Sequence, residues 1–161
     1  MAESRIPQTV LFDLDGTLVD NFDAIALAAN HVLQVMGFPA QPREVICNSV
    51  GGGALGTMAR LVGKENAPTA TRLYLEHFPS VIFEGLRVYP GAREILRALR
   101  ARGTTVAVLT NKHRGNAVRI LEHLGMDREL DGIFGTVEVP WRKPEPAFTR
   151  YTLDTLSLIH I

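Results

Sequence analysis

The sequence predicts an α/β protein with a doubly wound parallel sheet and an inserted all-helical cap. Short apolar runs typical of buried strands alternate with segments of helical spacing, and strands that alternate with helices form parallel sheets. A long stretch after the first apolar run, residues 20–87, contains helical patterns only. We therefore assign residues 1–19 and 88–161 to the sheet domain and residues 20–87 to the cap.

Three apolar segments are predicted strands: residues 8–12, 104–109 and, more weakly, 132–137. Each is a continuous apolar or β-branched run that stops at polar or glycine residues, as expected for strands buried on both faces. Their carboxyl ends would lie along one edge of the sheet, where open α/β folds bind ligands. A cap inserted after the first strand would cover that edge like a lid.

Helices are predicted wherever apolar residues recur every three or four positions. Pro42 suits the first position of a helix, whereas Pro79 must kink or split the helix that contains it. The glycines at residues 51–53 break the cap pattern, either as a simple helix breaker or as a lid loop whose backbone touches substrate. The predicted helices span residues 20–36, 42–50, 54–62 and 69–83 in the cap, and 92–101, 116–124 and 146–161 around the sheet.

Composition excludes several classes of protein. The 161 residues are 46% hydrophobic and 21% charged, which is typical of a globular domain rather than a disordered chain. Seventeen basic and seventeen acidic residues balance, so nothing favours bulk binding to nucleic acid or to an acidic membrane. Without an apolar run of membrane length, a signal-peptide pattern or more than one cysteine, the sequence predicts a cytoplasmic protein.

Polar clusters follow the three predicted strands. Asp13 and Asp15 follow the first, Thr110 and Asn111 the second, and Lys143 lies in the loop after the third. Any of these residues alone would be read as a turn, cap or solvated residue. Because parallel strands bring their carboxyl ends together, the coincidence at all three positions instead predicts a shared site. Lys112 and Asn111 stay open between a site role and a structural one.

The residue types suit phosphate chemistry. One carboxylate of the Asp13 and Asp15 pair can attack phosphorus while the other handles the proton of the leaving oxygen. Mg²⁺ commonly joins one or two carboxylates to a substrate phosphate, and would offset their repulsion. Lys143 adds positive charge and Thr110 a hydrogen-bond donor. Gly16 would let the backbone approach the anion and form a nest of N–H groups.

These motifs resemble the haloacid dehalogenase superfamily, and within it the phosphoglycolate phosphatase-like group with a helical cap. The first motif is highly specific, and the other two are convincing in combination. Further support comes from residues 17–20, 50–53 and 89–91. The three motifs are Phe12-Asp13-Leu14-Asp15-Gly16-Thr17-Leu18, Leu109-Thr110-Asn111-Lys112 and Arg142-Lys143-Pro144-Glu145-Pro146.

The resemblance implies Mg²⁺-dependent hydrolysis of a small phosphorylated metabolite, such as 2-phosphoglycolate, through an aspartyl-phosphate. Asp13 would be the nucleophile and Asp15 the general acid/base. The Asp13 carboxylate and the Asp15 main-chain oxygen would hold the metal, and Thr110 and Lys143 would bind the phosphoryl group. Asp15 argues against true dehalogenation, because the halide-releasing branch lacks that second acid.

The sequence departs from the family at its end. The family's fourth motif, an acidic pair after a further strand beside the first one, has no counterpart after residue 156. We therefore expect a C-terminally incomplete core, foreign residues at 157–161, an edge position for the first strand and little turnover. A phosphomutase or pyrophosphatase of the same fold, or an inactive binding module, remain alternatives. The oligomeric state is not indicated.

Overall fold

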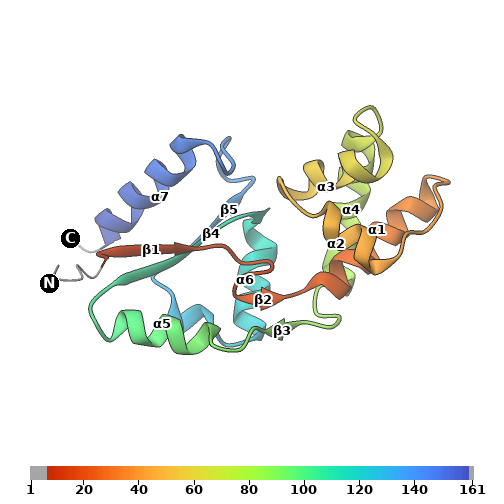
Figure 1. Cartoon of the computed structure of the whole chain (residues 1–161). Coiled ribbons are helices and arrows are strands. Elements are labelled where there is room, and N and C mark those ends of the chain that lie inside the picture. The colour runs from red at the N-terminus through yellow and green to blue at the C-terminus, as the bar shows by residue number, and fades with distance from the viewer. Residues whose placement is uncertain (1–6, 160–161) are drawn as a thin grey trace, which may run out of the picture.

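A computed structural model describes residues 7–159, and within them it has the predicted α/β fold. Three parallel strands, β1 (Thr9–Phe12), β4 (Thr105–His113) and β5 (Gly132–Thr136), form a sheet in the order β1-β4-β5. Within these residues β1 therefore lies at one edge of the sheet, as predicted. Figure 1 shows the sheet with the N-terminal strand beside the long central strand β4.

Helices cover both faces of this sheet because the side chains of β4 alternate. Val106 and Val108 point into a core that includes residues of α5 (Ala92–Arg100) and α6 (Arg114–His123). Ala107 and Leu109 point to the opposite face, where they pack under α7 (Pro146–Ile159) with Phe148 and Leu156. Figure 1 shows α7 on one side of the sheet and α5 on the other, which is the doubly wound arrangement.

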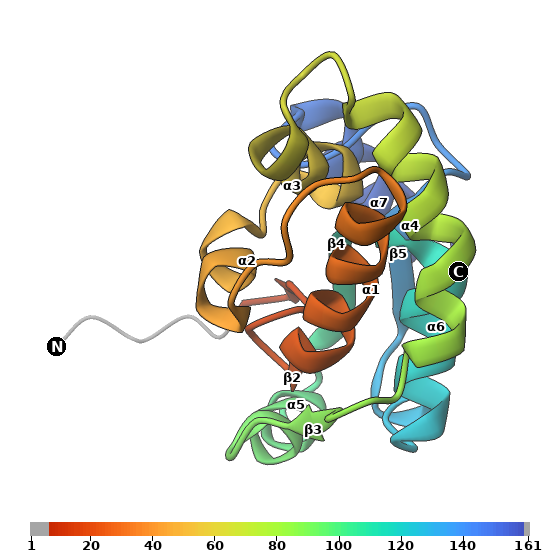
Figure 2. The same cartoon turned by 90° about the vertical axis from the view of Figure 1, so that its right-hand side faces the viewer.

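Four consecutive helices, residues 22–81, lie beyond the carboxyl ends of the strands (Figures 1 and 2). α1 packs mainly against α4, and several of its buried residues are alanines, whose small side chains allow a close approach. Tyr74 and Phe78 of α4 belong to the same buried cluster as Val106 and Val108, so this core continues from one face of the sheet into the four helices. The four helices are α1 (Phe22–Val35), α2 (Arg43–Ser49), α3 (Gly53–Val62) and α4 (Ala67–Val81).

The structure corrects the expectation for Pro42 and excludes one of the two outcomes expected for Pro79. Pro42 precedes α2 as its N-cap and is not its first helical residue. Pro79 lies inside α4, which continues to Val81 and is not split. Pro79 is near the end of the helix, so its missing N–H removes one hydrogen bond from a turn that is about to end.

Two further differences concern strands. β4 runs four residues beyond the predicted end, through an irregularity between Leu109 and His113. A two-stranded antiparallel sheet, β2 (Val19–Asp20) with β3 (Arg87–Val88), was not predicted, because two-residue strands leave no periodic pattern. β2 leads into the four helices and β3 leads out of them, so this small sheet pairs the two segments that connect the helices to the main sheet. A short 3₁₀ helix, Asp127–Glu129, precedes β5.

A helix that crosses a lipid bilayer has to be both long and apolar. Among residues 7–159, no helix is long enough and apolar enough to span a membrane.

Candidate active site

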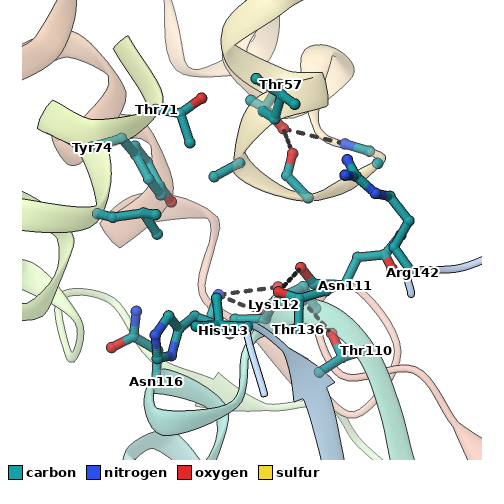
Figure 3. Close-up of a pocket in the computed structure, with 18 of the residues that line it drawn as sticks. Thr57, Thr71, Tyr74, Thr110, Asn111, Lys112, His113, Asn116, Thr136 and Arg142 are labelled. Atoms are coloured by element: carbon teal, nitrogen blue, oxygen red, sulfur yellow. Dashed lines mark hydrogen bonds and ion pairs between the residues drawn. The ribbon is translucent and has the colours of Figure 1, made fainter. Parts of the chain in front are cut away.

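A cavity of about 350 Å³ lies between the carboxyl edge of the sheet and the helices α3 and α4. Figure 3 shows polar side chains of β4 on one side of it and side chains of α3 and α4 on the other. Segments that are far apart in the sequence therefore meet here. The lining includes Asp13, Asp15, Val50, Gly51, Gly52, Gly53, Thr57, Thr71, Tyr74, Phe78, Thr110, Asn111, Lys112, His113, Asn116, Trp141 and Arg142.

Asp13 and Lys143 form an ion pair at this edge. Asp13 directly follows β1, Lys143 follows β5, and the Lys143 Nζ atom lies 2.8 Å from Asp13 Oδ2. The other carboxylate oxygen, Oδ1, accepts a hydrogen bond from the Leu14 N–H at 2.8 Å. Because the Asp13 side chain is still 45% exposed, the carboxylate is oriented yet reachable from the cavity.

Asp15 is held from two sides. The Lys112 Nζ atom lies 3.1 and 3.0 Å from its two carboxylate oxygens, and Asn21 Nδ2 donates to Oδ1 at 2.8 Å. The Lys112 side chain is only 8% exposed, and its ammonium lies 4.6 Å from the centre of the Phe78 ring of α4. Lys112, which the sequence left undecided, therefore connects Asp15 to the helical cap. Nothing in the local sequence around Asn21 indicated its contact with Asp15.

Thr110 lies at the floor of the cavity and is 1% exposed. Its hydroxyl oxygen accepts a hydrogen bond from the Lys112 N–H at 3.1 Å. A hydroxyl that accepts one bond still has its own proton to donate. Thr110 can thus donate to an oxygen of a bound anion, as the sequence predicts.

Asn111 is a candidate phosphate-binding residue whose role the sequence leaves open, and its contacts are structural ones. Its Oδ1 atom accepts from the Lys143 N–H at 2.7 Å, and its Nδ2 atom donates to the Lys143 carbonyl at 3.1 Å. Both ends of the amide therefore hold the backbone of the loop that carries Lys143. This geometry favours a positioning role rather than a direct contact with phosphate.

Gly16, also predicted to bind phosphate, forms a turn instead. Its φ of 76° lies in the left-handed region, and its N–H donates to the Val19 carbonyl at 2.9 Å. The N–H groups of Thr17, Leu18 and Val19 all donate to the Leu14 carbonyl. The turn uses the donors that an anion nest would need, and Gly16 does not line the cavity.

The glycine triplet of the cap borders the cavity, in keeping with the lid interpretation. A Cβ atom on Gly53 would stand 3.0 Å from the Asn111 carbonyl oxygen, so a side chain there would crowd the end of β4. Arg60 donates to the Gly51 carbonyl at 2.7 Å and so ties the loop to α3. Burial, and then the charge of Asp15, raises the pKa of Tyr74 on α4.

The donor set suits a metal only in part. Over residues 7–159, no group of three or more histidine, cysteine or acidic side chains lies close enough to hold an ion. Asp13 does offer one exposed carboxylate, and Mg²⁺ is often held by one or two carboxylates together with the oxygens of a substrate phosphate. The residues therefore fit Mg²⁺ as a companion of bound phosphate.

Known proteins resemble this chain over nearly its whole length. Residues 10–160 match the model of the haloacid dehalogenase-like hydrolase family. A phosphoglycolate phosphatase of Rhodospirillum rubrum is 35% identical, over 95% of this chain and 68% of that protein. A phosphoglycolate phosphatase of Haemophilus influenzae is 33% identical over 84% of this chain, which spans 66% of that relative's length. The crystal structure of a predicted phosphoglycolate phosphatase from Haemophilus somnus has a TM-score of 0.84 and 26% identity, covering 96% and 74% of the two chains.

Proposed function

Because the chain belongs to the haloacid dehalogenase-like hydrolase family, we propose that it is a Mg²⁺-dependent phosphatase of small phosphate monoesters. One observation carries this proposal. The exposed Asp13 carboxylate pairs with Lys143 at 2.8 Å and shares a cavity with Asp15 and Thr110. A nucleophile, a proton-handling acid, a cation and a hydroxyl donor are the groups that phosphoryl transfer to a carboxylate needs.

The first step is an attack of an Asp13 oxygen on phosphorus. A bond forms between that oxygen and phosphorus while the bond from phosphorus to the ester oxygen breaks, which leaves an aspartyl-phosphate and an alcohol. Asp15 in its protonated form gives the departing oxygen its proton. Lys143 and Thr110 stabilise the charge on the phosphoryl oxygens.

The second step is hydrolysis of the aspartyl-phosphate. Asp15, now a carboxylate, takes a proton from a water molecule whose oxygen attacks phosphorus. The bond from phosphorus to Asp13 breaks, which frees the carboxylate and inorganic phosphate. Lys112 and Asn21 hold Asp15 in place in both steps, since they bond its two oxygens.

We propose that the Asp13 carboxylate and the Asp15 main-chain oxygen hold the Mg²⁺. The ion would offset the repulsion between carboxylate and phosphate and align the reacting oxygens. Because residues 7–159 supply no further carboxylate cluster, this chain should bind Mg²⁺ weakly and turn over more slowly than the Rhodospirillum rubrum relative. Equal turnover of the two proteins would contradict that part of the proposal.

The proposed substrate is 2-phosphoglycolate or a phosphate ester of similar size. Two kinds of support are available: the names of the relatives, and a cavity at the small end of the usual range for ligand sites. The decisive experiment measures phosphate released from 2-phosphoglycolate and p-nitrophenyl phosphate, with and without Mg²⁺. Asp13→Asn keeps the shape of the side chain and should abolish release.

Pyrophosphate and a sugar phosphate as further substrates, together with a phosphate-binding measurement, separate the alternative functions. Release from pyrophosphate alone would indicate a pyrophosphatase, and isomerisation of a sugar phosphate without release would indicate a mutase. Binding of phosphate without any release, even at high protein concentration, would indicate a binding module. Release that survives in Asp13→Asn would overturn the assignment of the nucleophile.

A further inference from the structure

The roof of the cavity contains a hydroxyl that the proposed chemistry does not use. Tyr74 of α4 is 7% exposed and lines the cavity, and its hydroxyl makes no hydrogen bond to any residue between 7 and 159. Its ring stacks on Phe78 with the centroids 5.3 Å apart, so the ring position is set by packing. A hydroxyl that opens into a cavity and has no protein partner is free to donate a hydrogen bond to an oxygen of a ligand bound there.

The direction of this hydroxyl distinguishes it from its neighbour. In Figure 3 the Tyr74 hydroxyl points toward the floor of the cavity, where Lys112 lies, whereas the hydroxyl of Thr71 on the same helix points away from it. The Phe78 ring, on which the Tyr74 ring stacks, lies 4.6 Å from the Lys112 ammonium that bonds Asp15, so two contacts connect Tyr74 to the ion pair of that carboxylate. Burial raises the pKa of Tyr74, so the hydroxyl stays protonated and is a neutral donor in the cavity that Asp15 also lines.

This location determines which part of a substrate the hydroxyl meets. Asp15 gives its proton to the ester oxygen that leaves, so the atoms next to Asp15 belong to the leaving group. Leu75, Phe78 and the ring of Tyr74 make most of this wall apolar, and the Thr71 hydroxyl points away from the cavity floor. A donor aimed at the floor from such a wall discriminates between leaving groups by whether they have an acceptor oxygen at that place.

We propose that Tyr74 is a specificity-determining residue, and that its hydroxyl donates a hydrogen bond to a carboxylate or hydroxyl oxygen of the leaving group. The proposal rests on the proposed phosphatase function, which places the phosphoryl group at Asp13 and Lys143. It goes further by assigning the other end of the substrate to the cap. The cap would thus select among esters that all present the same phosphate to the sheet edge.

Tyr74→Phe tests this, because it removes the hydroxyl and keeps the stacked ring. The probes are three esters of similar size: 2-phosphoglycolate with a carboxylate, 2-hydroxyethyl phosphate with a hydroxyl, and ethyl phosphate with neither. Their kcat/KM values are measured with Mg²⁺. Their dissociation constants are measured in Asp13→Asn with and without Tyr74→Phe, because Asp13→Asn should bind the esters without turnover. Tyr151→Phe, which loses a hydroxyl on α7 outside the cavity lining, is the matched control.

We expect Tyr74→Phe to lower kcat/KM and affinity about tenfold for at least one oxygen-bearing ester, the usual effect of losing such a hydrogen bond, and to leave ethyl phosphate unchanged. The carboxylate and hydroxyl arms identify which oxygen is bound. An equal change for all three esters, or no change for any, would overturn the role of Tyr74. If none of the esters binds to any variant, the proposed function fails as well, so the two failures are distinguishable.

Discussion

The clearest test of the site concerns Asn111, whose amide bonds the backbone of Lys143 at both ends. Asn111→Ala removes the two hydrogen bonds, each contributing about 1 kcal/mol. The loop that carries Lys143 would then have to be ordered on binding, at a cost of up to about 2 kcal/mol. That corresponds to an affinity for phosphate about thirtyfold weaker.

A double-mutant cycle separates positioning from direct contact. Inorganic phosphate is titrated with Mg²⁺ by calorimetry into the wild type, Asn111→Ala, Lys143→Met and the double variant. If Asn111 acts through Lys143, its removal should matter little once the ammonium is gone, so the two effects should not add. Additive effects would refute the positioning role and indicate that Asn111 touches the anion. Asn116→Ala, an asparagine that also lines the cavity, is the control.

Three other predictions concern stability, measured by urea unfolding. Gly53→Ala and Gly37→Ala should both destabilise the protein by about 1–2 kcal/mol, because both glycines have a positive φ. Gly53→Ala should cost more, because its Cβ atom would also crowd the Asn111 carbonyl oxygen. Equal losses would contradict that close contact. Burial lowers the pKa of His77, so the unfolded chain binds the proton more readily and the free energy of unfolding should fall as the pH drops below about 6.5. His77→Gln should make this fall smaller. An unchanged pH profile in the variant would contradict the role of His77. Phe148→Ala, at a fully buried position under the sheet, should lower the free energy of unfolding by about 3–5 kcal/mol. Thr149→Ala, at the exposed neighbouring position, should change it by no more than about 0.5 kcal/mol. Similar losses in the two variants would show that α7 does not pack as described.

The three parallel strands could be predicted because each is an apolar run that ends at polar residues. The same logic predicted that Asp13, Thr110 and Lys143 would face one cavity edge, since parallel strands end together. Asp13 and Lys143 do pair, although their chemical roles remain predictions. β4 is the clearest of the three in the sequence, because a strand that is buried on both faces needs a continuous apolar run.

The separate roles of Asn111 and Lys112 could not be predicted in this way. The sequence places both in a turn, but β4 continues to His113, and successive side chains of a strand point to opposite sides. Asn111 and Lys112 therefore point to opposite faces of the sheet, where Asn111 bonds the loop of Lys143 and Lys112 bonds Asp15. The polar residues gave no periodic signal for the extra length, which depends on pairing with β5.

Gly16 and Tyr74 are two further residues whose roles the local sequence does not determine. A glycine after two aspartates is compatible with an anion nest or with a tight turn, and only the acceptors of its neighbours' N–H groups decide between them. Tyr74 falls on the apolar stripe of its helix, so its spacing predicts a core residue. The cavity beneath it arises from the approach of α4 to the sheet edge, which no local pattern contains.

The small sheet of β2 and β3 means that the chain departs for the four helices and comes back at a single crossing. Asp20 and Arg87 are opposite partners in that ladder, and their side chains pair at 3.0 Å. A two-residue turn can close such a ladder into a hairpin. An Asn-Gly turn in place of the intervening 66 residues, 21–86, would accordingly keep the strand partners in register, but it would remove the helical part of the buried cluster that Leu14 and Leu18 share.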